Sequence, residues 1–317
     1  MSVLVVSARD DWSAEQVADQ LTARGVEYSL FDPADFPQQM GLTAQLGGSG
    51  WQISMTDARG VVDLAHVTAV FYRRPRDFRM PAGMSGPELR FARAQARVGV
   101  GGLLAGLPAR WINHPSALAD HEYKPRQLVL AGQVGMQVPQ TLITNSATAA
   151  RAFAAEVGDV AVKPLAEPIV AEAGSATTVW TRRLGVKDMA DLAGVETTAH
   201  LFQQWIDKRF EVRLMAVGHR VFSVAIHAGS QAASVDWRSD YDALTYQVVD
   251  CPSSVTAAVG AYLRAAGLVY GAFDFVVDRD GAWWFLECNA AGQWGWLAEE
   301  CDLAIATALA DELIGGR

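Results

Sequence analysis

The chain has 317 residues and a formal net charge of −9 at pH 7; half of its residues are hydrophobic and 19% are charged. This composition is typical of a globular protein with a large core and excludes a disordered chain, while the acidic balance disfavours non-specific binding to nucleic acid or to an anionic membrane. No apolar run is long enough to span a bilayer, and the opening MSVLVVSARDDW lacks a basic region and a cleavage site. Three cysteines without metal-ligand spacing fit a reduced protein. We therefore expect a cytoplasmic protein whose partners include neither nucleic acid nor a membrane.

The first third of the chain predicts a parallel sheet. Val3–Ser7 reads as a buried strand, Asp11–Arg24 as a helix and Tyr28–Phe31 as a second strand, which together give a βαβ opening. Gln45–Met55 predicts a hairpin. A further strand, Val67–Tyr72, leads into the string FYRRP.

Two adjacent arginines, Arg73 and Arg74, follow this last strand. The carboxyl end of a strand is where α/β proteins bind ligands, so a substrate or dimer-interface role is one interpretation. The simpler one is a strand end with two solvated arginines. Glu88–Leu104 then predicts a long helix whose arginines form a solvated face.

Two lysines stand out in the middle of the chain. Ser116 can cap a helix that carries Lys124, and Pro125 predicts a break there. Lys163 ends the apolar strand Val160–Pro164. A nucleoside triphosphate needs cations on its phosphates, and lysine supplies a mobile point charge. Either lysine alone is weak evidence, because most lysines are surface residues.

The region after residue 176 predicts mainly strands. The expected elements are a returning strand Thr177–Leu184, a strand His200–Ile206, a hairpin of Phe210–Val217 with Arg220–Ile226, a helix Ser253–Ala266 capped by Ser253 or Ser254, and a closing helix Leu297–Ile314. Glu211 and Arg213 share a face of their strand and can pair. A second acid–arginine string, Asp236-Trp237-Arg238, follows. Arginine binds carboxylate or phosphate in a bidentate fork; the alternative is two surface salt bridges, which are worth little.

Gly271–Asp280 and Ala282–Trp296 flank a turn and predict a second hairpin. An even-length turn pairs Asp274 with Phe285. Alternation then places the polar side chains of Asp274, Glu287 and Asn289 on one face, and the other face carries Phe273, Phe275, Trp284, Leu286 and Cys288 as core. Two carboxylates and one amide oxygen suit Mg²⁺. The alternative is an exposed polar face of an edge hairpin.

The triad Asp274…Glu287-x-Asn289 resembles the metal-binding end of the ATP-grasp ligases. The following Gly292-Gln293-Trp294-x-Trp296, together with FYRRP, Glu-x-Arg and Asp-Trp-Arg, is similar to the graspetide synthetases, the microviridin-type ATP-grasp maturases that cyclise ribosomal peptides. The resemblance covers nearly the whole chain and implies an ATP-grasp fold of the α/β class with α+β lobes. It implies a parallel-sheet pre-ATP-grasp domain over residues 1–115, a central lobe over 116–200, and a C-terminal lobe with the metal site over 201–317.

The resemblance also implies roles for individual residues. Lys124 and Lys163 match the two phosphate-binding lysines. The backbone of the hinge, Gln203–Ile206 with Gln204 and Trp205 central, holds adenine, and Asp207 is a candidate for a ribose hydroxyl, although it reads equally well as a turn residue. The resemblance associates Arg213 and Arg238 with the acidic substrate side chain and the ATP phosphates, and it counts Glu211 and Asp236 with them as catalytic residues. Arg213 is the first candidate to stabilise the oxyanion. The implied metal site holds two Mg²⁺ ions, bridged by Glu287 and assisted by Asp274 and Asn289.

The function that the resemblance implies is an ATP-dependent carboxylate ligase. It activates Asp or Glu side chains of a precursor peptide as acyl phosphates and joins them to Ser, Thr or Lys side chains, giving ester or amide macrocycles. Its partners are a peptide with a leader and an acidic, hydroxyl-rich core, and a second copy in a homodimer. Two alternatives stay open. One is a ligase that adds a free amino acid to a protein tail or small acid. The other is a catalytically inactive nucleotide-binding regulator. Two departures from the maturases support this alternative: Ala290 and Ala291 stand where the maturases often have Pro and Asn, and the segment 164–178 is poor in glycine where they have a glycine-rich flap.

Overall fold

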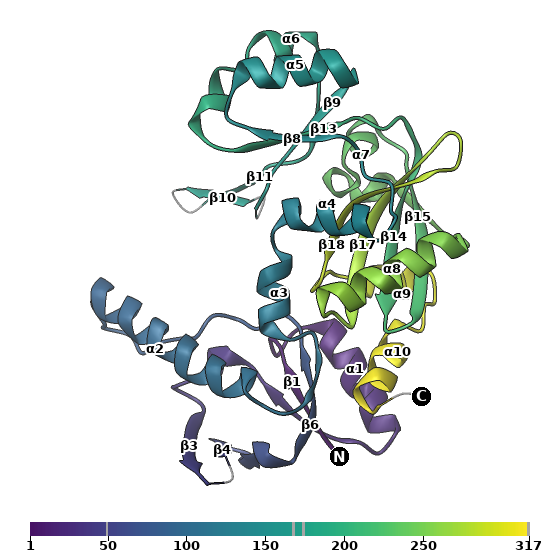
Figure 1. The fold of residues 1–317 in the computed structure, drawn as a ribbon. Helices are drawn as coiled ribbons and strands as arrows, with labels where there is room; N and C mark the ends of the chain where they lie inside the picture. Colours follow the sequence, from purple (N-terminus) through teal and green to yellow (C-terminus); the bar gives the residue numbers. More distant parts are fainter. Residues whose placement is uncertain (49, 167–168, 173–174, 316–317) are drawn as a thin grey trace.

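A computed structural model of the chain describes residues 1–48, 50–166, 169–172 and 175–315, which form three lobes (Figure 1). The N-terminal lobe lies at the bottom of the view, the central lobe at the top and the C-terminal lobe on the right. None of the helices in the described part of the chain combines the length and the apolar character needed to cross a bilayer. Short 3-10 helices connect some elements: Pro33–Asp35, Leu64–His66, Ala193–Thr197, Trp237–Ser239 and Tyr241–Ala243.

The N-terminal lobe contains the parallel sheet that the sequence predicts. Its strands run in the order β2-β1-β6-β7, and all neighbours are parallel. The strands are β1 (Ser2–Val6), β2 (Glu27–Phe31), β6 (Val67–Tyr72) and β7 (Arg110–Ile112). Helix α1 (Trp12–Ala23) connects β1 to β2, and the side chain of Asp11 caps its first turn. The expected βαβ opening is confirmed.

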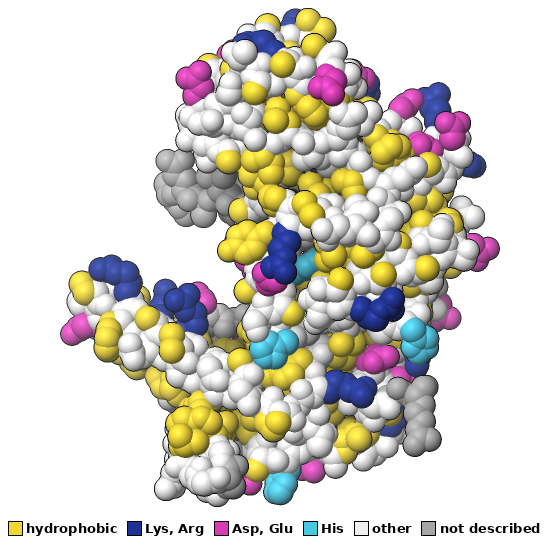
Figure 2. All heavy atoms as spheres, in the orientation of Figure 1, with side chains coloured by type: hydrophobic (Ala, Val, Ile, Leu, Met, Phe, Trp, Pro, Cys, Tyr) yellow, Lys and Arg dark blue, Asp and Glu magenta, His cyan; other side chains and the backbone are white. Residues whose placement is uncertain are grey.

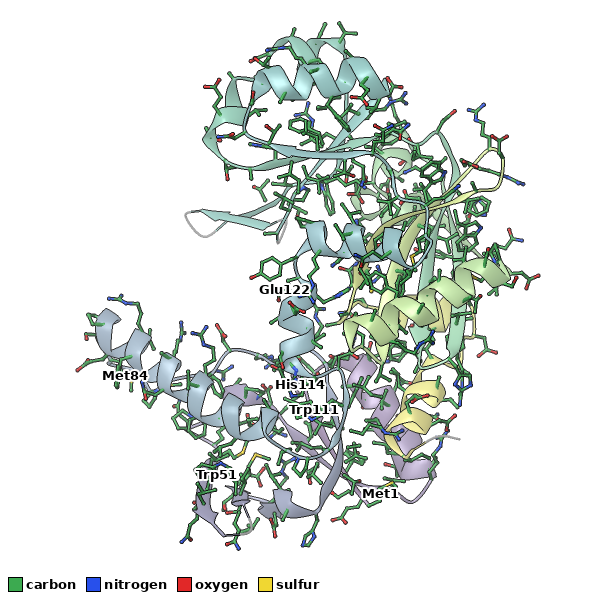
Figure 3. All side chains as sticks on the ribbon, in the orientation of Figure 1. Met1, Trp51, Met84, Trp111, His114 and Glu122 are labelled. Carbon is green, nitrogen blue, oxygen red and sulfur yellow. The ribbon has the colours of Figure 1, made fainter. Side chains whose placement is uncertain are left out.

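Two elements project from this sheet. The first is a three-stranded antiparallel sheet made of β3 (Gly41–Gly47), β4 (Gly50–Asp57) and β5 (Gly60–Asp63), whose first two strands confirm the predicted hairpin. The second is α2 (Gly86–Ala105), which begins with a capping box between Ser85 and Glu88. Figure 3 shows Met84 at the outer end of α2 and Trp51 on the small sheet.

The central lobe is reached through two helices. These are α3 (Pro115–His121) and α4 (Lys124–Gln133), and the break between them confirms the expectation at Pro125. The lobe itself is an antiparallel sheet of order β12-β9-β13-β8 covered by two helices (Figure 1). Its elements are β8 (Thr141–Thr144), α5 (Ala147–Val157), β9 (Val160–Lys163), β12 (Arg182–Leu184), α6 (Val186–Ala190) and β13 (His200–Gln204).

The predicted returning strand Thr177–Leu184 is wrong. The chain forms two strands there, β11 (Ser175–Thr178), which pairs with β10 (Ile169–Glu172), and β12, which pairs with β9. The change of partner requires a break, and Thr181 supplies it because its N–H donates to Asp236 Oδ2 at 3.2 Å rather than to a strand.

The C-terminal lobe is a five-stranded antiparallel sheet of order β16-β15-β14-β17-β18. Its strands are β14 (Lys208–Val217), β15 (Arg220–Ala228), β16 (Leu244–Val248), β17 (Tyr270–Asp278) and β18 (Trp283–Asn289), and its helices are α7 (Gln231–Val235), α8 (Ser253–Ala266), α9 (Gly295–Glu300) and α10 (Ile305–Leu313). Helix α8 buries Val259, Tyr262 and Leu263 against one face of this sheet, where Phe273 and Phe285 are fully buried. The opposite face carries Arg213 and Asp274, and toward the N-terminal lobe it carries apolar residues such as Met215.

Two expectations about the helices of this lobe are wrong. The N-cap of α8 is Pro252, and no side chain caps this helix, so neither Ser253 nor Ser254 does so. The closing helix Leu297–Ile314 is two helices, α9 and α10. Asp302 lies between them at a φ of 49°, in the left-handed region, which a continuous helix cannot contain.

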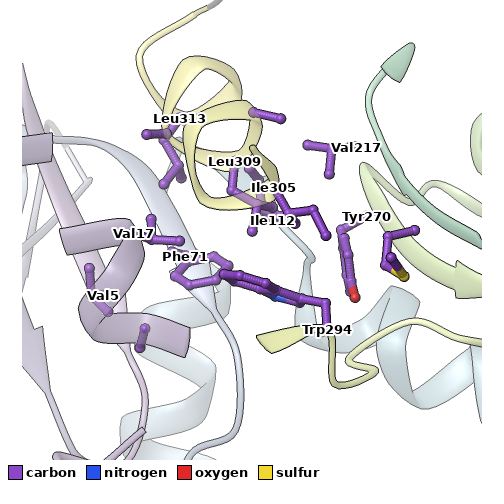
Figure 4. Close-up of a cluster of buried hydrophobic side chains, with 14 of the residues drawn as sticks. Val5, Val17, Phe71, Ile112, Val217, Tyr270, Trp294, Ile305, Leu309 and Leu313 are labelled. Atoms are coloured by element: carbon purple, nitrogen blue, oxygen red, sulfur yellow. The ribbon is translucent and has the colours of Figure 1, made fainter. Parts of the chain in front are cut away.

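A hydrophobic cluster joins the N-terminal lobe to the C-terminal lobe. Figure 4 shows Val17 of α1 and Phe71 of β6 beside Leu309 of α10, with Trp294 and Tyr270 at the other end of the cluster. These side chains are almost completely buried. The two lobes therefore share one core, which fixes the end of β6 against the loop that follows β18.

Candidate active site

The β17–β18 hairpin brings the predicted triad together, but in a different register. Asp274 pairs with Glu287 and Phe275 pairs with Phe285, so the predicted pairing of Asp274 with Phe285 is wrong. A β-bulge places Leu286 as an extra residue between the two pairs. As a result Phe285 packs in the core, whereas Leu286, Glu287 and Asn289 line a cleft. The prediction that Leu286 belongs to the core is therefore also wrong.

Two arginines neutralise the carboxylates of the triad. Arg213 Nη1 lies 2.8 Å from Asp274 Oδ1, and Arg238 Nη2 lies 2.7 Å from Asp274 Oδ2 and 2.9 Å from Glu287 Oε1. Asn289 Nδ2 lies 3.4 Å from oxygens of both carboxylates. The alternative of an exposed polar face is excluded, because Asp274 and Arg213 are each only 4% exposed.

The sequence suggested that Arg213 pairs with Glu211, but in the structure it does not. Arg213 lies directly opposite Asp274 across the β14–β17 ladder, and directly opposed residues are closer than two residues that share a face of one strand. Glu211 instead accepts from Lys208 Nζ at 2.6 Å. Burial raises the pKa of Glu211, and Lys208 acts against this.

The Asp236-Trp237-Arg238 string contributes both its charged side chains. Asp236 Oδ1 lies 3.5 Å from Arg238 Nη1 and also accepts from the Arg238 backbone N–H at 3.2 Å. Burial opposes the charge of Arg238, but Asp274, Glu287 and Asp236 outweigh it and raise the pKa of Arg238 above its ordinary value. The guanidinium therefore stays charged and is held toward the triad.

Lys124 reaches the site from helix α4. Gln127, one turn further along, accepts from the Cys288 N–H at 2.9 Å and fixes α4 against β18. Lys124 Nζ then lies 3.1 Å from Glu287 Oε2 and 2.8 Å from the carbonyl oxygen of Pro164. Burial opposes ionisation of Glu287, but Lys124 and Arg238 outweigh it and hold the pKa of Glu287 below its usual range.

Lys163 enters from the central lobe. It ends β9, and its Nζ donates to Gln203 Oε1 at 2.8 Å. Burial lowers the pKa of Lys163 to about 8, although Glu287 and Glu211 act in the opposite direction. Lys163 and Lys124 thus face the same cleft from two lobes.

The predicted hinge borders the same cleft, with one exception. Gln203, Gln204, Trp205 and Ile206 line it, whereas Asp207 lies outside it, exposed and 3.0 Å from Arg279. The N–H groups of Gln204 and Trp205 donate to the carbonyls of Gln140 and Asp159, each at 2.8 Å. In the described part of the chain, the Ile206 N–H has no backbone acceptor.

The cleft has a volume of about 1370 Å³ and lies where the three lobes meet. The N-terminal lobe contributes Tyr72 and Arg74, helix α4 contributes Lys124, and the segments on either side of the β10–β11 hairpin contribute Ala166 and Trp180. Figure 2 shows the molecule hollowed between α2 and the upper lobe. In Figure 3 Glu122, near the end of α3, lies between the lower and upper lobes.

The donor set fits a hard divalent cation. Asp274, Glu287 and Asn289 supply carboxylate and amide oxygens, and a cationic nitrogen, Arg238 Nη2, already lies within 2.9 Å of both carboxylates. The site therefore accommodates positive charge between these oxygens. Across residues 1–48, 50–166, 169–172 and 175–315 no group of three or more His, Cys, Asp and Glu side chains is placed to hold a metal ion. A metal at this position would rely on two carboxylates, the amide and substrate oxygens.

Sequence reasoning missed two features of the site. The first is that each arginine stacks on a tryptophan. The guanidinium carbon of Arg238 lies 5.0 Å from the centre of the Trp237 ring, and that of Arg213 lies 5.9 Å from the centre of the Trp296 ring. The two indoles stack with their ring centres 5.7 Å apart. Arg73 is 4% exposed, so the interpretation of two solvated arginines is wrong for Arg73 and holds only for Arg74. The adjacency of Trp237 and Arg238 in the sequence was an available signal for one of these contacts, whereas nothing local in the sequence links Arg213 to Trp296.

Comparisons with known proteins show which proteins this chain resembles. The domain family described as the MvdD pre-ATP grasp domain matches residues 2–119. Curated protein sequences gave no match. Among solved structures, macrocyclase MdnC from Microcystis aeruginosa MRC, bound with precursor peptide MdnA, is 28% identical over 100% of both chains, with a TM-score of 0.88.

Two further structures are similar over nearly their full length. Macrocyclase MdnB from Microcystis aeruginosa MRC is 26% identical, covers 99% of each chain and has a TM-score of 0.80. A RiPP-associated ATP-grasp ligase from Chryseobacterium gregarium, in complex with ADP and a leader and core peptide, is 24% identical, covers 99% of this chain and 96% of its own, and has a TM-score of 0.90. The resemblance read from the motifs and the α/β ATP-grasp fold with its pre-ATP-grasp domain are confirmed.

Proposed function

From the premise that this chain shares its fold and motifs with the ATP-grasp ribosomal peptide maturases, we propose that it is an ATP-dependent carboxylate ligase and peptide macrocyclase. It activates Asp or Glu side chains of a ribosomally made precursor peptide as acyl phosphates. It then joins them to Ser or Thr as esters, or to Lys as amides. The observation that carries the proposal is the convergence of Lys124, Lys163, Arg213 and Arg238 with the triad of two carboxylates and one amide in one cleft.

The nucleotide lies in the part of the cleft between the hinge and the lysines. Lys124 and Lys163, which both line this cleft, neutralise its phosphates. Adenine binds along the backbone of Gln203–Ile206. Its ring nitrogen accepts a hydrogen bond from the Ile206 N–H, because the N–H groups of Gln204 and Trp205 already have acceptors. Asp207 has no ribose role in this arrangement because its side chain points away from the cleft, toward Arg279.

The carboxylate to be activated binds next to the triad. Arg213 and Arg238 present guanidinium groups there on a tryptophan platform, and a guanidinium binds a carboxylate or an acyl phosphate in a fork. Asp274, Glu287 and Asn289 would hold Mg²⁺, for which we expect two ions, and the metal would neutralise phosphate charge when it is bound. Glu211 and Asp236 support these groups indirectly: Glu211 holds Lys208 in position and Asp236 holds Arg238.

Bond formation then needs a nucleophile and protection from water. The hydroxyl or amine of the same peptide attacks the acyl carbon, the C–O bond to phosphate breaks, and the phosphate leaves with the proton of the nucleophile. Arg213 stabilises the oxyanion of the tetrahedral intermediate. The side chains of Trp180, Trp237 and Trp296 line the cleft and limit its water content. A leader segment bound elsewhere on the enzyme raises the effective concentration of the core.

A homodimer in the cytoplasm completes the proposal. Phe91 and Val98 lie seven residues apart on α2, hence on one face, and are 67% and 71% exposed. Such an apolar stripe supports self-association of the N-terminal lobes. Light scattering of the wild-type chain and of a Phe91→Glu variant tests this part separately.

Peptide-stimulated ADP release tests the proposed activity. With Mg²⁺ and a peptide rich in Thr, Ser, Asp and Glu, the wild-type chain releases ADP in proportion to the side-chain ester or amide bonds formed. Glu287→Gln abolishes this release, whereas Glu299→Gln, the same change at an exposed position on α9, leaves it unchanged. Full activity of Glu287→Gln contradicts the metal assignment. Stimulation by free amino acids, and not by peptides, supports the ligase that adds a free amino acid.

A further inference from the structure

Arg73 is a buried cation at the carboxyl end of β6, and its backbone N–H donates to the Val6 carbonyl at 3.0 Å. Its Nε lies 3.2 Å from Asp11 Oδ2, the carboxylate that caps α1. A guanidinium withdrawn from water must be compensated by acceptors around it. One carboxylate from its own lobe supplies part of this compensation.

The remaining acceptors of Arg73 come from the other lobe. Nη1 donates to the carbonyl oxygen of Gly292 at 3.2 Å, and Nη2 donates to Gln293 Oε1. The guanidinium carbon lies 5.9 Å from the centre of the Trp294 ring. Arg73 therefore contacts three successive residues of the loop that follows the triad strand.

This loop in turn determines the position of Arg213. Arg213 Nη2 donates to the Gln293 carbonyl at 3.0 Å while Nη1 bonds Asp274. The packing is tight, because a Cβ added to Gly292 would lie 2.6 Å from Ala272 Cβ and 2.7 Å from Arg213 Nη2. A displacement of the loop by a few tenths of an ångström would therefore move the guanidinium of Arg213.

We propose that Arg73 is a positioning residue for the ligase reaction. It holds Gly292 and Gln293 from the N-terminal lobe, and these residues fix the guanidinium of Arg213 on the activated carboxylate. The inference rests on the proposed function for its kinetic consequence, but the contacts themselves require only the fold. The N-terminal lobe thus takes part in the chemistry although it contributes no group to the triad.

A purely structural role for Arg73 gives different results from a positioning role. If Arg73 only joined the two lobes, its loss would lower the melting temperature but leave the turnover of the folded enzyme unchanged. If it positions Arg213, the acyl phosphate still forms but is transferred poorly, and water competes with the peptide nucleophile. The ratio of ADP released to bonds formed then rises.

The test compares Arg73→Met with Arg76→Met, which removes an exposed guanidinium from the same segment. For Arg73→Met we expect kcat for bond formation to fall about 10- to 100-fold, as for an active group displaced by up to an ångström. We also expect the KM for ATP to stay within about twofold and the ADP-to-bond ratio to rise. Arg76→Met should match the wild type. A kcat for Arg73→Met within about twofold of the wild type overturns the inference.

Two additions separate this result from failure to fold and from failure of the proposed function. If Arg73→Met does not fold, Arg73→Lys replaces it, because one ammonium keeps the charge but cannot bond both loop oxygens; the same kcat criterion applies. Hydrogen exchange of the segment 289–296 needs no activity. The exchange should accelerate in Arg73→Met and not in Arg76→Met, and unchanged exchange overturns the inference even if the wild-type chain forms no ester or amide bond.

Discussion

The protonation of Lys163 gives a pH signature for nucleotide binding. Burial lowers the pKa of Lys163 to about 8 in the empty cleft. A triphosphate beside the ammonium restores its charge, so binding takes up a proton wherever Lys163 is neutral beforehand. From a pKa of about 8, the uptake is about 0.1 proton per nucleotide at pH 7, about 0.5 at pH 8 and about 0.9 at pH 9.

The sign of the affinity change follows from the same pKa. The binding-competent ammonium is fully populated well below pH 8 and falls to about a tenth at pH 9, so the affinity for nucleotide weakens about tenfold by pH 9. Lys163→Arg should abolish both effects, because a guanidinium stays charged throughout this range. Lys187→Arg, at an exposed position on α6, is the matched control and should retain them.

Calorimetric titration with Mg²⁺ and a non-hydrolysable ATP analogue measures the uptake. The titration is repeated at each pH in two buffers of different ionisation enthalpy, and the difference in heat gives the protons taken up. An uptake that Lys163→Arg leaves unchanged would refute the assignment of Lys163 to the phosphates. So would an affinity that does not fall between pH 7 and pH 9.

Three further predictions concern stability. Asp274→Ala leaves the buried Arg213 without its carboxylate and should lower the free energy of unfolding by about 3–5 kcal/mol in urea denaturation. Phe273→Ala should lower the free energy of unfolding by about 3–5 kcal/mol, because it leaves a cavity at a fully buried position. Val248→Ala, at a 54% exposed position, should change the free energy of unfolding by less than about 0.5 kcal/mol. Burial lowers the pKa of His121 to about 4, so the unfolded chain binds the proton first and stability falls as the pH drops from about 6.5 to 4, by about 2–3 kcal/mol. A flat stability profile over this range would contradict the buried, neutral state of His121.

The sequence predicted which side chains meet in the cleft better than it predicted how they pair. Alternation along β18 brought Glu287 and Asn289 to the face of Asp274, and the structure agrees. The bulge at Leu286 was invisible, because a single extra residue changes no composition and leaves the apolar pattern ambiguous. The partner of Arg213 was missed for a related reason: Asp274, which lies opposite it on the neighbouring strand, is 61 residues away in the chain.

The connection between the lobes was the part that local patterns could not predict. Arg73 reads as a solvated strand end until the fold places Gly292 and Gln293 against it. The same holds for α10, whose apolar side chains pack on α1 and β6 of the N-terminal lobe as well as on the sheet of its own lobe. Such contacts depend on the three-dimensional arrangement of distant segments, whereas helix and strand signals are local in the sequence.

The central claim is that this chain closes rings in a precursor peptide, and intact mass tests it most directly. The chain is co-expressed with a short peptide, encoded beside its gene, that has a leader and a tail rich in Thr, Ser, Asp and Glu. We predict that this peptide loses whole water molecules in dependence on Glu287, with base-labile losses for esters and stable losses for amides. A peptide of unchanged mass, recovered beside wild-type enzyme that binds ATP, would contradict the account.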